Sequence, residues 1–401
     1  MKVAIIGGGA AGFFAAINVK ENYPEATVDI YERSNKVLSK VKVSGGGRCN
    51  LTNGTTSIKE LCDAYPRGAK YLKKAFKQFS TKDTRDWFAK KGVASYIQDD
   101  NRVFPVSNKS QSVIDCFLKS CNELNININK KNNVLNIFTT GEKIVLNIDN
   151  KTLSFDKVII TTGGNPKLSG FDFLKNLNIK IENPLPSLFT FNMPNESIRN
   201  LMGLVAEKVS VSIQGEKLNA SGDLLITHWG MSGPAILKLS AFGAKILAEK
   251  EYHFTIHINW IGISNHEEVR ESLKRQIENH PNKFIFKHKV FPIANRLWHY
   301  LLEKCDINET KKYSELGKKG LNKLINILVN DNFVVEGKTT FKEEFVTCGG
   351  VNLQNIDINT MQSKDIPNLY FAGEVLNIDG ITGGYNFQAA WTTAFIAAKL
   401  S

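Results

Sequence analysis

Residues 7–12 have the types and spacing of a turn that binds phosphate groups. An apolar run at 3–6 predicts a strand, the glycine-rich residues follow it directly, and an apolar stretch after them predicts a helix. In such a strand–turn–helix, Gly7 makes the turn, Gly9 lets the backbone approach a pyrophosphate, and Gly12 brings the helix close to the sheet. The unpaired N–H groups at the start of the helix also favour a phosphate.

An acidic residue stands at the distance that this turn requires. The second predicted strand, 27–31, ends at Glu32, which follows Gly12 by 20 residues. A carboxylate at that place accepts hydrogen bonds from the hydroxyls of an adenosine ribose and repels a 2′-phosphate. We therefore predict a site for an ADP-containing dinucleotide, and the alternative is a glycine-rich turn without a ligand.

The composition is typical of a globular enzyme with two or three domains. The chain has 401 residues, of which 42% are hydrophobic and 22% are charged. No apolar run reaches the ~18 residues of a membrane span, and glycines interrupt the apolar N-terminus, so we expect a cytoplasmic protein without a membrane partner or a signal peptide. The six cysteines form no C-x-x-C pair, which predicts free thiols and no metal site.

The positive charge is concentrated in one segment. The net charge is +12, and residues 67–91 hold nine Lys and Arg against two Asp, a net charge of +7. A helix expected over 68–79 places four basic residues on the face opposite its apolar residues: Lys70, Lys73, Lys74 and Lys77. This face is either simply solvated or a stripe that binds the phosphates of an RNA.

The remaining pattern predicts an α/β chain in which a parallel-sheet domain is interrupted by a second domain. Ser80 and Asp83 predict a capping box for a helix that Gly92 ends. Further elements are expected as a helix at 110–124, a hairpin at 134–148, a strand at 157–160, antiparallel strands over 188–260, helices over 265–330, strands near 333–346, a strand at 369–371 and a last helix through 398.

Three more glycine-rich stretches are suited to close contact with a ligand. They are 44–53 with its three consecutive glycines, 161–164 after a buried strand, and 383–386 at the start of the last helix. The positive end of that helix can face the pyrimidine side of a flavin and stabilise negative charge there. There is no second G-x-G-x-x-G, so any nicotinamide would reach the flavin only transiently.

Several strings resemble one family over essentially the whole chain. They are GGGAAG (7–12), SGGGRCNLTN (44–53), TTGG (161–164), THWGMSGPA (227–235), TCGGV (347–351), MQSK (361–364) and YFAGEVLNIDGITGGYNFQAAW (370–391). The chain resembles the BaiN/RdsA-like FAD-dependent oxidoreductases, also labelled aminoacetone-oxidase-like. The resemblance implies a Rossmann-type FAD-binding domain of the glutathione-reductase type (1–187 and 347–401), an inserted antiparallel β domain (188–262 and 331–346) and a small helical subdomain (263–330).

The resemblance and the residue patterns together give one set of candidate contacts to non-covalently bound FAD. The set is Gly7, Gly9, Ala10, Ala11, Gly12, Glu32, Arg33, Lys40, Ser44, Gly45, Gly46, Gly47, Arg48, Asn50, Val134, Thr162, Gly163, Gly164, Gly373, Glu374, Asp379, Gly383, Gly384, Tyr385 and Asn386.

The resemblance also implies a reaction without deciding the substrate. One branch reduces a uridine of large-subunit (23S) ribosomal RNA to dihydrouridine with NAD(P)H, and the concentrated basic charge favours this branch. Hydride would pass from flavin N5 to C6 of the uracil and a proton to C5, with Cys49 or His228 as the acid and Tyr385 binding a carbonyl. The alternatives are an FAD-dependent oxidase of a small amine and a flavoprotein that only binds. No stable protein partner is inferred.

Overall fold

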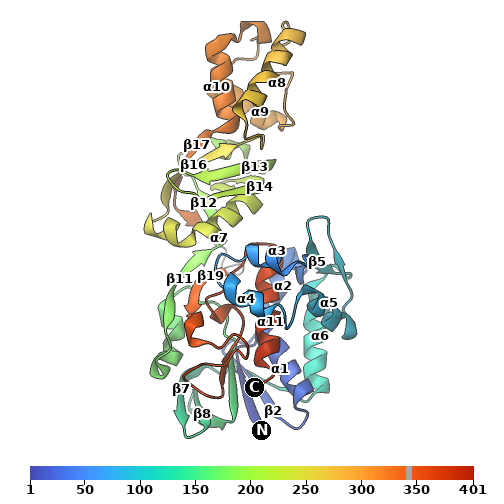
Figure 1. Cartoon of the computed structure of the whole chain (residues 1–401), viewed down its shortest axis with the longest axis vertical. Helices are drawn as coiled ribbons and strands as arrows, with labels where there is room; N and C mark the ends of the chain where they lie inside the picture. Colours follow the sequence, from blue (N-terminus) through green and yellow to red (C-terminus); the bar gives the residue numbers. More distant parts are fainter. Residues whose placement is uncertain (340–345) are drawn as a thin grey trace. The chain divides into compact units, whose positions relative to one another are not determined.

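The structure, a computed structural model, describes residues 1–339 and 346–401. Over these residues the chain divides into two compact units (Figure 1). Unit 1 is built from residues 1–187 together with 346–401, and unit 2 from residues 188–339. The segment 263–330, for which the sequence predicts a separate helical subdomain, lies within unit 2. Residues 340–345, which belong to the predicted β domain and to the strands expected near 333–346, lie outside the described residues.

A parallel sheet forms the centre of unit 1. In the described part of the chain its five strands have the order β20-β10-β1-β2-β6, with these bounds: β20 Leu369–Phe371, β10 Lys157–Ile160, β1 Lys2–Ile6, β2 Thr27–Glu32 and β6 Asn127–Lys130. The apolar runs that predict β1, β10 and β20 are almost wholly buried, because both faces of a parallel sheet are covered. The sequence pattern does not predict β6, whose Asn127 and Asn129 have low β-propensity.

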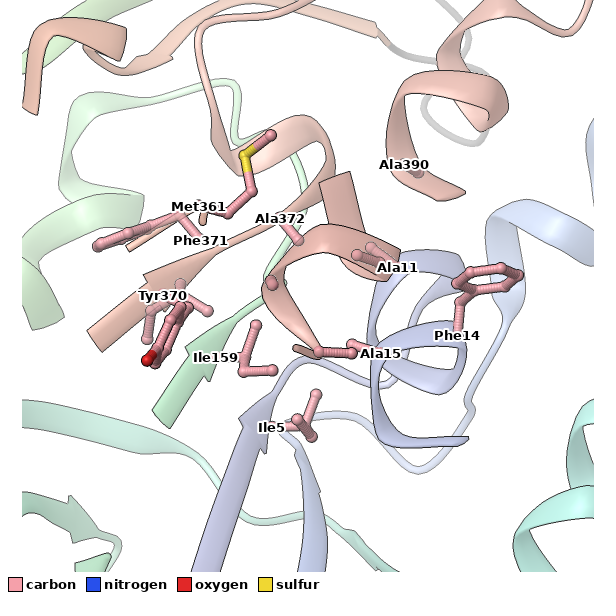
Figure 2. Close-up of a cluster of buried hydrophobic side chains, with 14 of the residues drawn as sticks. Ile5, Ala11, Phe14, Ala15, Ile159, Met361, Tyr370, Phe371, Ala372 and Ala390 are labelled. Atoms are coloured by element: carbon pink, nitrogen blue, oxygen red, sulfur yellow. The ribbon is translucent and has the colours of Figure 1, made fainter. Parts of the chain in front are cut away.

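Helices cover this sheet. Helix α1 (Ala10–Asn22) packs against α11 (Tyr385–Ala397), so the start and the end of unit 1 meet in one core. Figure 2 shows a cluster of buried side chains that includes Ala11 and Ala15 on α1 and the sheet residues Ile5 and Ile159. Small side chains allow the helix to approach the strands closely, as the glycine turn that precedes α1 requires.

Most of the other predicted elements of unit 1 are present. The capping box of Ser80 and Asp83 starts α5 (Thr81–Lys90), and Gly92 follows its end with a left-handed backbone. Helix α6 (Ser110–Glu123) is confirmed, and the predicted hairpin is β7 (Val134–Thr140) with β8 (Lys143–Ile148). The remaining elements of unit 1 are α2 (Ser39–Gly47), β3 (Thr52–Asn53), α3 (Ile58–Asp63), α4 (Ala69–Ala75), β4 (Ser95–Ile97), β5 (Arg102–Pro105), β9 (Lys151–Phe155), η1 (Leu168–Leu177), β11 (Ile181–Ser187), β19 (Val346–Val351), η4 (Leu353–Asn355) and η5 (Gly373–Val375).

One predicted helix is shorter than expected. The sequence predicts a helix over 68–79, but α4 ends at Ala75, and the chain continues in a turn in which the N–H groups of Gln78 and Phe79 both bond the Ala75 carbonyl oxygen. The predicted division into two faces is confirmed, since Leu72 and Phe76 are buried whereas the four lysines are exposed.

Unit 2 is an antiparallel sheet with helices. Among the described residues, seven strands follow the order β17-β16-β13-β14-β15-β12-β18, with these bounds: β12 Thr190–Asn192, β13 Val205–Ile213, β14 Asn219–Thr227, β15 Gly230–Ser232, β16 His253–Asn259, β17 Asp331–Glu336 and β18 Lys338–Thr339. The helical elements are η2 (Ser197–Leu201), α7 (Pro234–Glu249), α8 (His266–Asn279), α9 (Asn295–Lys304), η3 (Tyr313–Glu315) and α10 (Gly317–Val329). The antiparallel strands and the helix after Pro234 confirm the predicted pattern.

Over the residues that the structure describes, no helix has both the length and the apolar character needed to cross a bilayer. Within the same residues, no three side chains of the His, Cys, Asp or Glu type gather as metal ligands would. All six cysteines are buried, and none of them forms a disulfide within the described residues.

Candidate cofactor site

The glycines in the turn between β1 and α1 have two different roles. A Cβ atom at Gly7 would overlap the carbonyl oxygen of Thr161, and one at Gly12 would overlap the carbonyl oxygen of Gly7. At Gly9 a Cβ atom would meet no atom within 4 Å, so the chain is open to a ligand there. Gly9 also precedes the first turn of α1, whose N–H groups no capping side chain occupies. The turn therefore presents N–H groups and the positive end of the helix to open space, as a pyrophosphate requires.

Glu32 is held beside this turn. One of its carboxylate oxygens accepts the N–H of Gly8 at 2.8 Å, and the other accepts the N–H of Ser34, also at 2.8 Å. Each carboxylate oxygen has more than one lone pair, so both can still accept a ribose hydroxyl. The two backbone bonds fix the orientation of the carboxylate at the end of β2.

A cavity of about 300 Å³ lies next to Glu32 and the glycine turn. Its walls include six of the predicted cofactor residues: Gly7, Glu32, Arg33, Val134, Thr162 and Gly163. The other walls come mainly from 132–135 and from residues 165–173 after the TTGG string. Gly163 has a left-handed backbone and no atom near an added Cβ. This volume lies at the lower end of the range for ligand pockets and suits one part of a dinucleotide, such as an adenosine.

The segment with three consecutive glycines interrupts a helix. Helix α2 loses its helical dihedral angles at Ser44, and Gly45, Gly46 and Gly47 all have positive φ values. The predicted loop conformation is therefore present. A Cβ atom at Gly46 or Gly47 would meet nothing within 4 Å, which leaves this backbone free for close contact with a ligand. The guanidinium of Arg48 lies 4.0 Å from the centre of the Phe104 ring.

Lys40, Gly164 and Glu374 come together although they are far apart in the sequence. The Lys40 ammonium and the Glu374 carboxylate form an ion pair at 2.7 Å, and the second oxygen of Glu374 accepts the N–H of Thr347 at 3.0 Å. A Cβ atom at Gly164 would lie 2.7 Å from that oxygen. The hydroxyl of Thr347 is buried and has no hydrogen-bond partner among the described residues, so a bound polar group would satisfy it.

Hydrogen bonds connect the start of α11 to the residues that follow the three consecutive glycines. The side-chain amide of Asn50 accepts the N–H of Gly384 at 2.9 Å and donates to the carbonyl oxygen of Thr52 at 3.0 Å. A Cβ atom at Gly384 would overlap the Thr52 carbonyl oxygen, so only glycine fits this junction. Asn386 bonds both backbone groups of Gly380, each at 2.8 Å. These two amides hold loops together, a role that their sequence positions alone do not indicate.

Asp379 forms an ion pair that the sequence analysis does not anticipate. Its carboxylate is fully buried and accepts two hydrogen bonds from the Arg67 guanidinium and one from the Ser187 hydroxyl at 2.7 Å. Burial raises the pKa of this carboxyl, and the contacts with Arg67 and Ser187 oppose that rise. Arg67 and Ser187 are absent from the predicted site, and a spacing of 312 residues between Arg67 and Asp379 gives no sequence signal. The side chain of Asp379 thus supports its loop.

Two of the predicted catalytic residues lie in unit 1. Cys49 is fully buried, and burial raises the pKa of its thiol to about 12, which makes it a weak acid at neutral pH. This favours a packing role for Cys49. Tyr385 begins α11, and its ring meets that of Tyr65 edge-on at 6.0 Å. Burial also raises the pKa of the Tyr385 phenol, so at neutral pH it remains a hydrogen-bond donor.

The third predicted catalytic residue belongs to unit 2. His228 is exposed in the turn between β14 and β15, and its ring lies against that of Trp229 with 3.8 Å between the centres. Its carbonyl oxygen accepts a hydrogen bond from Arg199 at 3.4 Å. The turn thus holds the backbone of His228 in place and leaves the imidazole in solvent.

These features define unit 1 as a Rossmann-type dinucleotide-binding unit. The family model described as the HI0933-like protein Rossmann domain matches residues 1–400, and the chain belongs to this family. The resemblance to the BaiN/RdsA-like oxidoreductases is thereby confirmed.

Two characterised relatives match nearly the whole chain. A 3-dehydro-bile acid delta(4,6)-reductase of Clostridium scindens is 25% identical over 411 residues, which cover 99% of this chain and 98% of that protein. A ribosomal RNA dihydrouridine synthase of Escherichia coli is 27% identical over 404 residues, with 98% and 96% covered. Among solved structures, a 3-ketosteroid delta1-dehydrogenase from Sterolibacterium denitrificans shares the fold, with a TM-score of 0.53, 12% identity and coverage of 99% and 98%. The chain is an FAD-dependent oxidoreductase.

Proposed function

We propose that this oxidoreductase reduces a uridine of large-subunit ribosomal RNA to dihydrouridine, with NAD(P)H as the electron donor. The relatives from Escherichia coli and Haemophilus influenzae that are named ribosomal RNA dihydrouridine synthase support this substrate class. The observation in the chain itself that carries the proposal is the distribution of positive charge on α4 and in the turn after it.

The four lysines of this segment are all exposed. Lys70, Lys73, Lys74 and Lys77 have no carboxylate partner in the part of the chain that the structure describes, while Leu72 and Phe76 anchor the opposite face in the core. The buried face therefore holds the segment in place, and the four ammonium groups carry charge that no ion pair among the described residues neutralises. Such a surface binds phosphates and is suited to RNA of any sequence.

The reduction requires the chain to position the uracil and to supply one proton. FAD that NAD(P)H has reduced would supply the hydride, with its two electrons, for C6, and an acid would supply the proton for C5. The Tyr385 phenol keeps its proton at neutral pH and can donate a hydrogen bond to the C4 carbonyl oxygen as negative charge develops there. Of the two candidate acids, Cys49 is buried and its pKa is raised to about 12, so its thiol is a poor proton donor at neutral pH.

The genetic test compares ribosomal RNA from a strain that lacks this gene with RNA from its parent. We expect one dihydrouridine in the large-subunit RNA to disappear and to return when the gene is restored. Mass spectrometry of nuclease fragments measures both changes and identifies the nucleotide. Unchanged dihydrouridine in the deletion strain would reject the proposed substrate. It would then favour a small molecule, such as the bile acid that the name of the Clostridium relative specifies.

The biochemical test replaces Lys70, Lys73, Lys74 and Lys77 with Gln. RNA binding should weaken to a similar degree for all sequences, and the slope of log affinity against log salt should flatten by roughly 0.7–0.9 for each phosphate that the variant no longer binds. FAD content and reduction by NAD(P)H should not change, because these side chains point to solvent.

A matched control removes the same charge elsewhere in unit 1. Lys109, Lys151, Lys175 and Lys364 are exposed and lie outside 67–91, so their replacement with Gln should leave the slope unchanged. If the two quadruple variants bind RNA alike, the lysines of α4 have no specific part in binding.

A further inference from the structure

A second part of the chain carries the rest of the net charge. Residues 263–330 hold 13 Lys and Arg against 8 Asp and Glu, a net charge of +5. Together with the +7 of residues 67–91, this accounts for the whole net charge of +12, and the remaining residues are balanced. The positive charge is therefore placed in two segments, one in each unit.

Within unit 2 the charge is concentrated in one loop. No Asp or Glu occurs between Glu278 and Glu303. The loop between α8 and α9 contains Lys283, Lys287 and Lys289, which are all exposed, and among the described residues none of them forms an ion pair. We refer to residues 281–289 as the basic loop.

Hydrogen bonds to neighbouring elements hold the basic loop in one shape. Its backbone pairs with 311–313, since the N–H of Ile285 bonds the carbonyl oxygen of Lys311 at 3.0 Å and the N–H of Tyr313 bonds that of Lys283 at 3.1 Å. The Trp298 indole donates to the carbonyl oxygen of Ile285 at 3.0 Å. A loop held in this way presents its lysines at fixed places, so binding costs little ordering of the backbone.

Aromatic side chains accompany the charge. Ile285 is fully buried, whereas Phe284 and Phe286 on either side of it are only half-buried. Phe286 stacks on the His299 ring, with 3.7 Å between the ring centres and 18° between the planes. Phe284 has no ring partner of this kind among the residues that the structure describes, and the Lys287 ammonium lies 6.0 Å from its centre. A half-exposed ring among lysines provides a platform for an unpaired base.

We propose that the basic loop is a second contact for RNA, in which Lys283, Lys287 and Lys289 bind phosphates and Phe284 stacks on an unpaired base. This inference rests on the proposed function, because it takes ribosomal RNA as the substrate. An anionic membrane surface also attracts lysines, but interfacial anchors insert a continuous apolar helix face, and here the apolar Ile285 points into the core of unit 2.

The test uses the full-length protein with FAD and 23S ribosomal RNA purified from the deletion strain. The triple Lys→Gln variant of the basic loop should lower the log–log salt slope by roughly 2–3 in total, from 0.7–0.9 for each bound phosphate. Phe284→Ala should weaken binding by about five- to a hundredfold without changing the slope, because the side chain is neutral. Phe284→Tyr keeps the ring and should bind as the parent does.

The control variant replaces Lys208, Lys217 and Lys245, which are exposed lysines of unit 2 outside the loop, with Gln and should retain the parental slope. FAD content and the melting temperature are measured for every variant, so that loss of folding is recognised. Equal slopes for the two triple variants overturn the proposal, as does Phe284→Ala binding with parental affinity. A third outcome also overturns the proposal: the parent binds phosphatidylglycerol vesicles, and the basic-loop variant loses this binding but binds RNA as before. That outcome assigns the loop to a membrane surface.

Formation of dihydrouridine by the parent protein on the same RNA separates this inference from the proposed function. If the parent forms dihydrouridine and the basic-loop variants bind as it does, only the second contact is wrong. If the parent neither binds nor reduces the RNA, both proposals fail.

Discussion

Two glycine-rich segments of unit 1 use the missing side chain for different purposes. In residues 7–12, an added Cβ atom at Gly7 or Gly12 would overlap the backbone of unit 1 itself. In residues 45–47, an added Cβ atom at Gly46 or Gly47 would meet nothing within 4 Å. A glycine can therefore be required by the packing of the chain or by the approach of a ligand. Each segment also contains a glycine of the other kind. A Cβ atom at Gly9 would meet nothing, and one at Gly45 would lie 2.9 Å from the backbone nitrogen of Asn50. Gly46 differs from Gly9 in its positive φ, which glycine adopts without strain.

The largest effect is expected where glycine is required by packing. In Gly12→Ala the new methyl group would overlap the Gly7 carbonyl oxygen, so the turn and α1 must move apart. We expect a loss of about 3 kcal/mol or more in the free energy of unfolding, together with the loss of FAD. Chemical denaturation of the FAD-free protein measures the stability. Parental stability in that experiment would contradict the distinction between the two kinds of glycine.

A smaller effect, confined to the cofactor, is expected at Gly9. Its φ of −94° suits any residue, and an added Cβ atom meets nothing in the chain, so Gly9→Ala should leave the stability of the FAD-free protein unchanged. The methyl group would occupy the space that a pyrophosphate needs, and FAD affinity should fall by roughly a hundredfold. Flavin fluorescence on titration measures the affinity. Parental affinity would show that the phosphates do not approach Gly9.

The smallest of these effects is expected at Glu32, which lies beside the first segment. Glu32→Ala removes a charged acceptor for the ribose hydroxyls, which should cost about 1.5–3 kcal/mol and lower FAD affinity by roughly ten- to a hundredfold. It also removes the bonds to the N–H groups of Gly8 and Ser34, so the FAD-free protein should lose some stability, unlike Gly9→Ala. Calorimetric titration of both variants compares them directly. A variant that keeps FAD as tightly as the parent would exclude Glu32 from the ribose contact.

Much of the fold follows from periodic patterns within short windows of sequence. Buried runs predict β1, β10 and β20, and the Ser80–Asp83 pair predicts the start of α5. The pattern fails at β11, where Pro184 and Pro186 cannot donate to a ladder, yet the strand forms because its pairing with β19 shifts register between Glu182 and Leu185. The sequence pattern also predicts a helix that is several residues longer than α4, since the apolar spacing continues into the turn after Ala75.

The candidate site is predictable only in part, for a physical reason. The glycine turn and Glu32 lie within one βαβ unit, so their spacing carries the signal. The pair of Arg67 and Asp379 depends on the packing of segments from opposite ends of the chain, and no local pattern marks it. In the same way, Asn50 is recognisable as a site residue, but its bonds to Gly384 and Thr52 depend on tertiary structure.

Unit 1 is built from two segments that are separated in the sequence, and this has a consequence for the synthesis of the protein. Strand β20 pairs with β10 in the sheet and α11 packs against α1, so the cofactor site is complete only after residues 369–397 have left the ribosome. Unit 2 is contiguous and emerges whole before then. At about 5–20 residues per second, the nascent chain carries an incomplete parallel sheet for tens of seconds while 188–368 are translated. The order of synthesis therefore allows unit 2 to fold first and unit 1 to bind the flavin last.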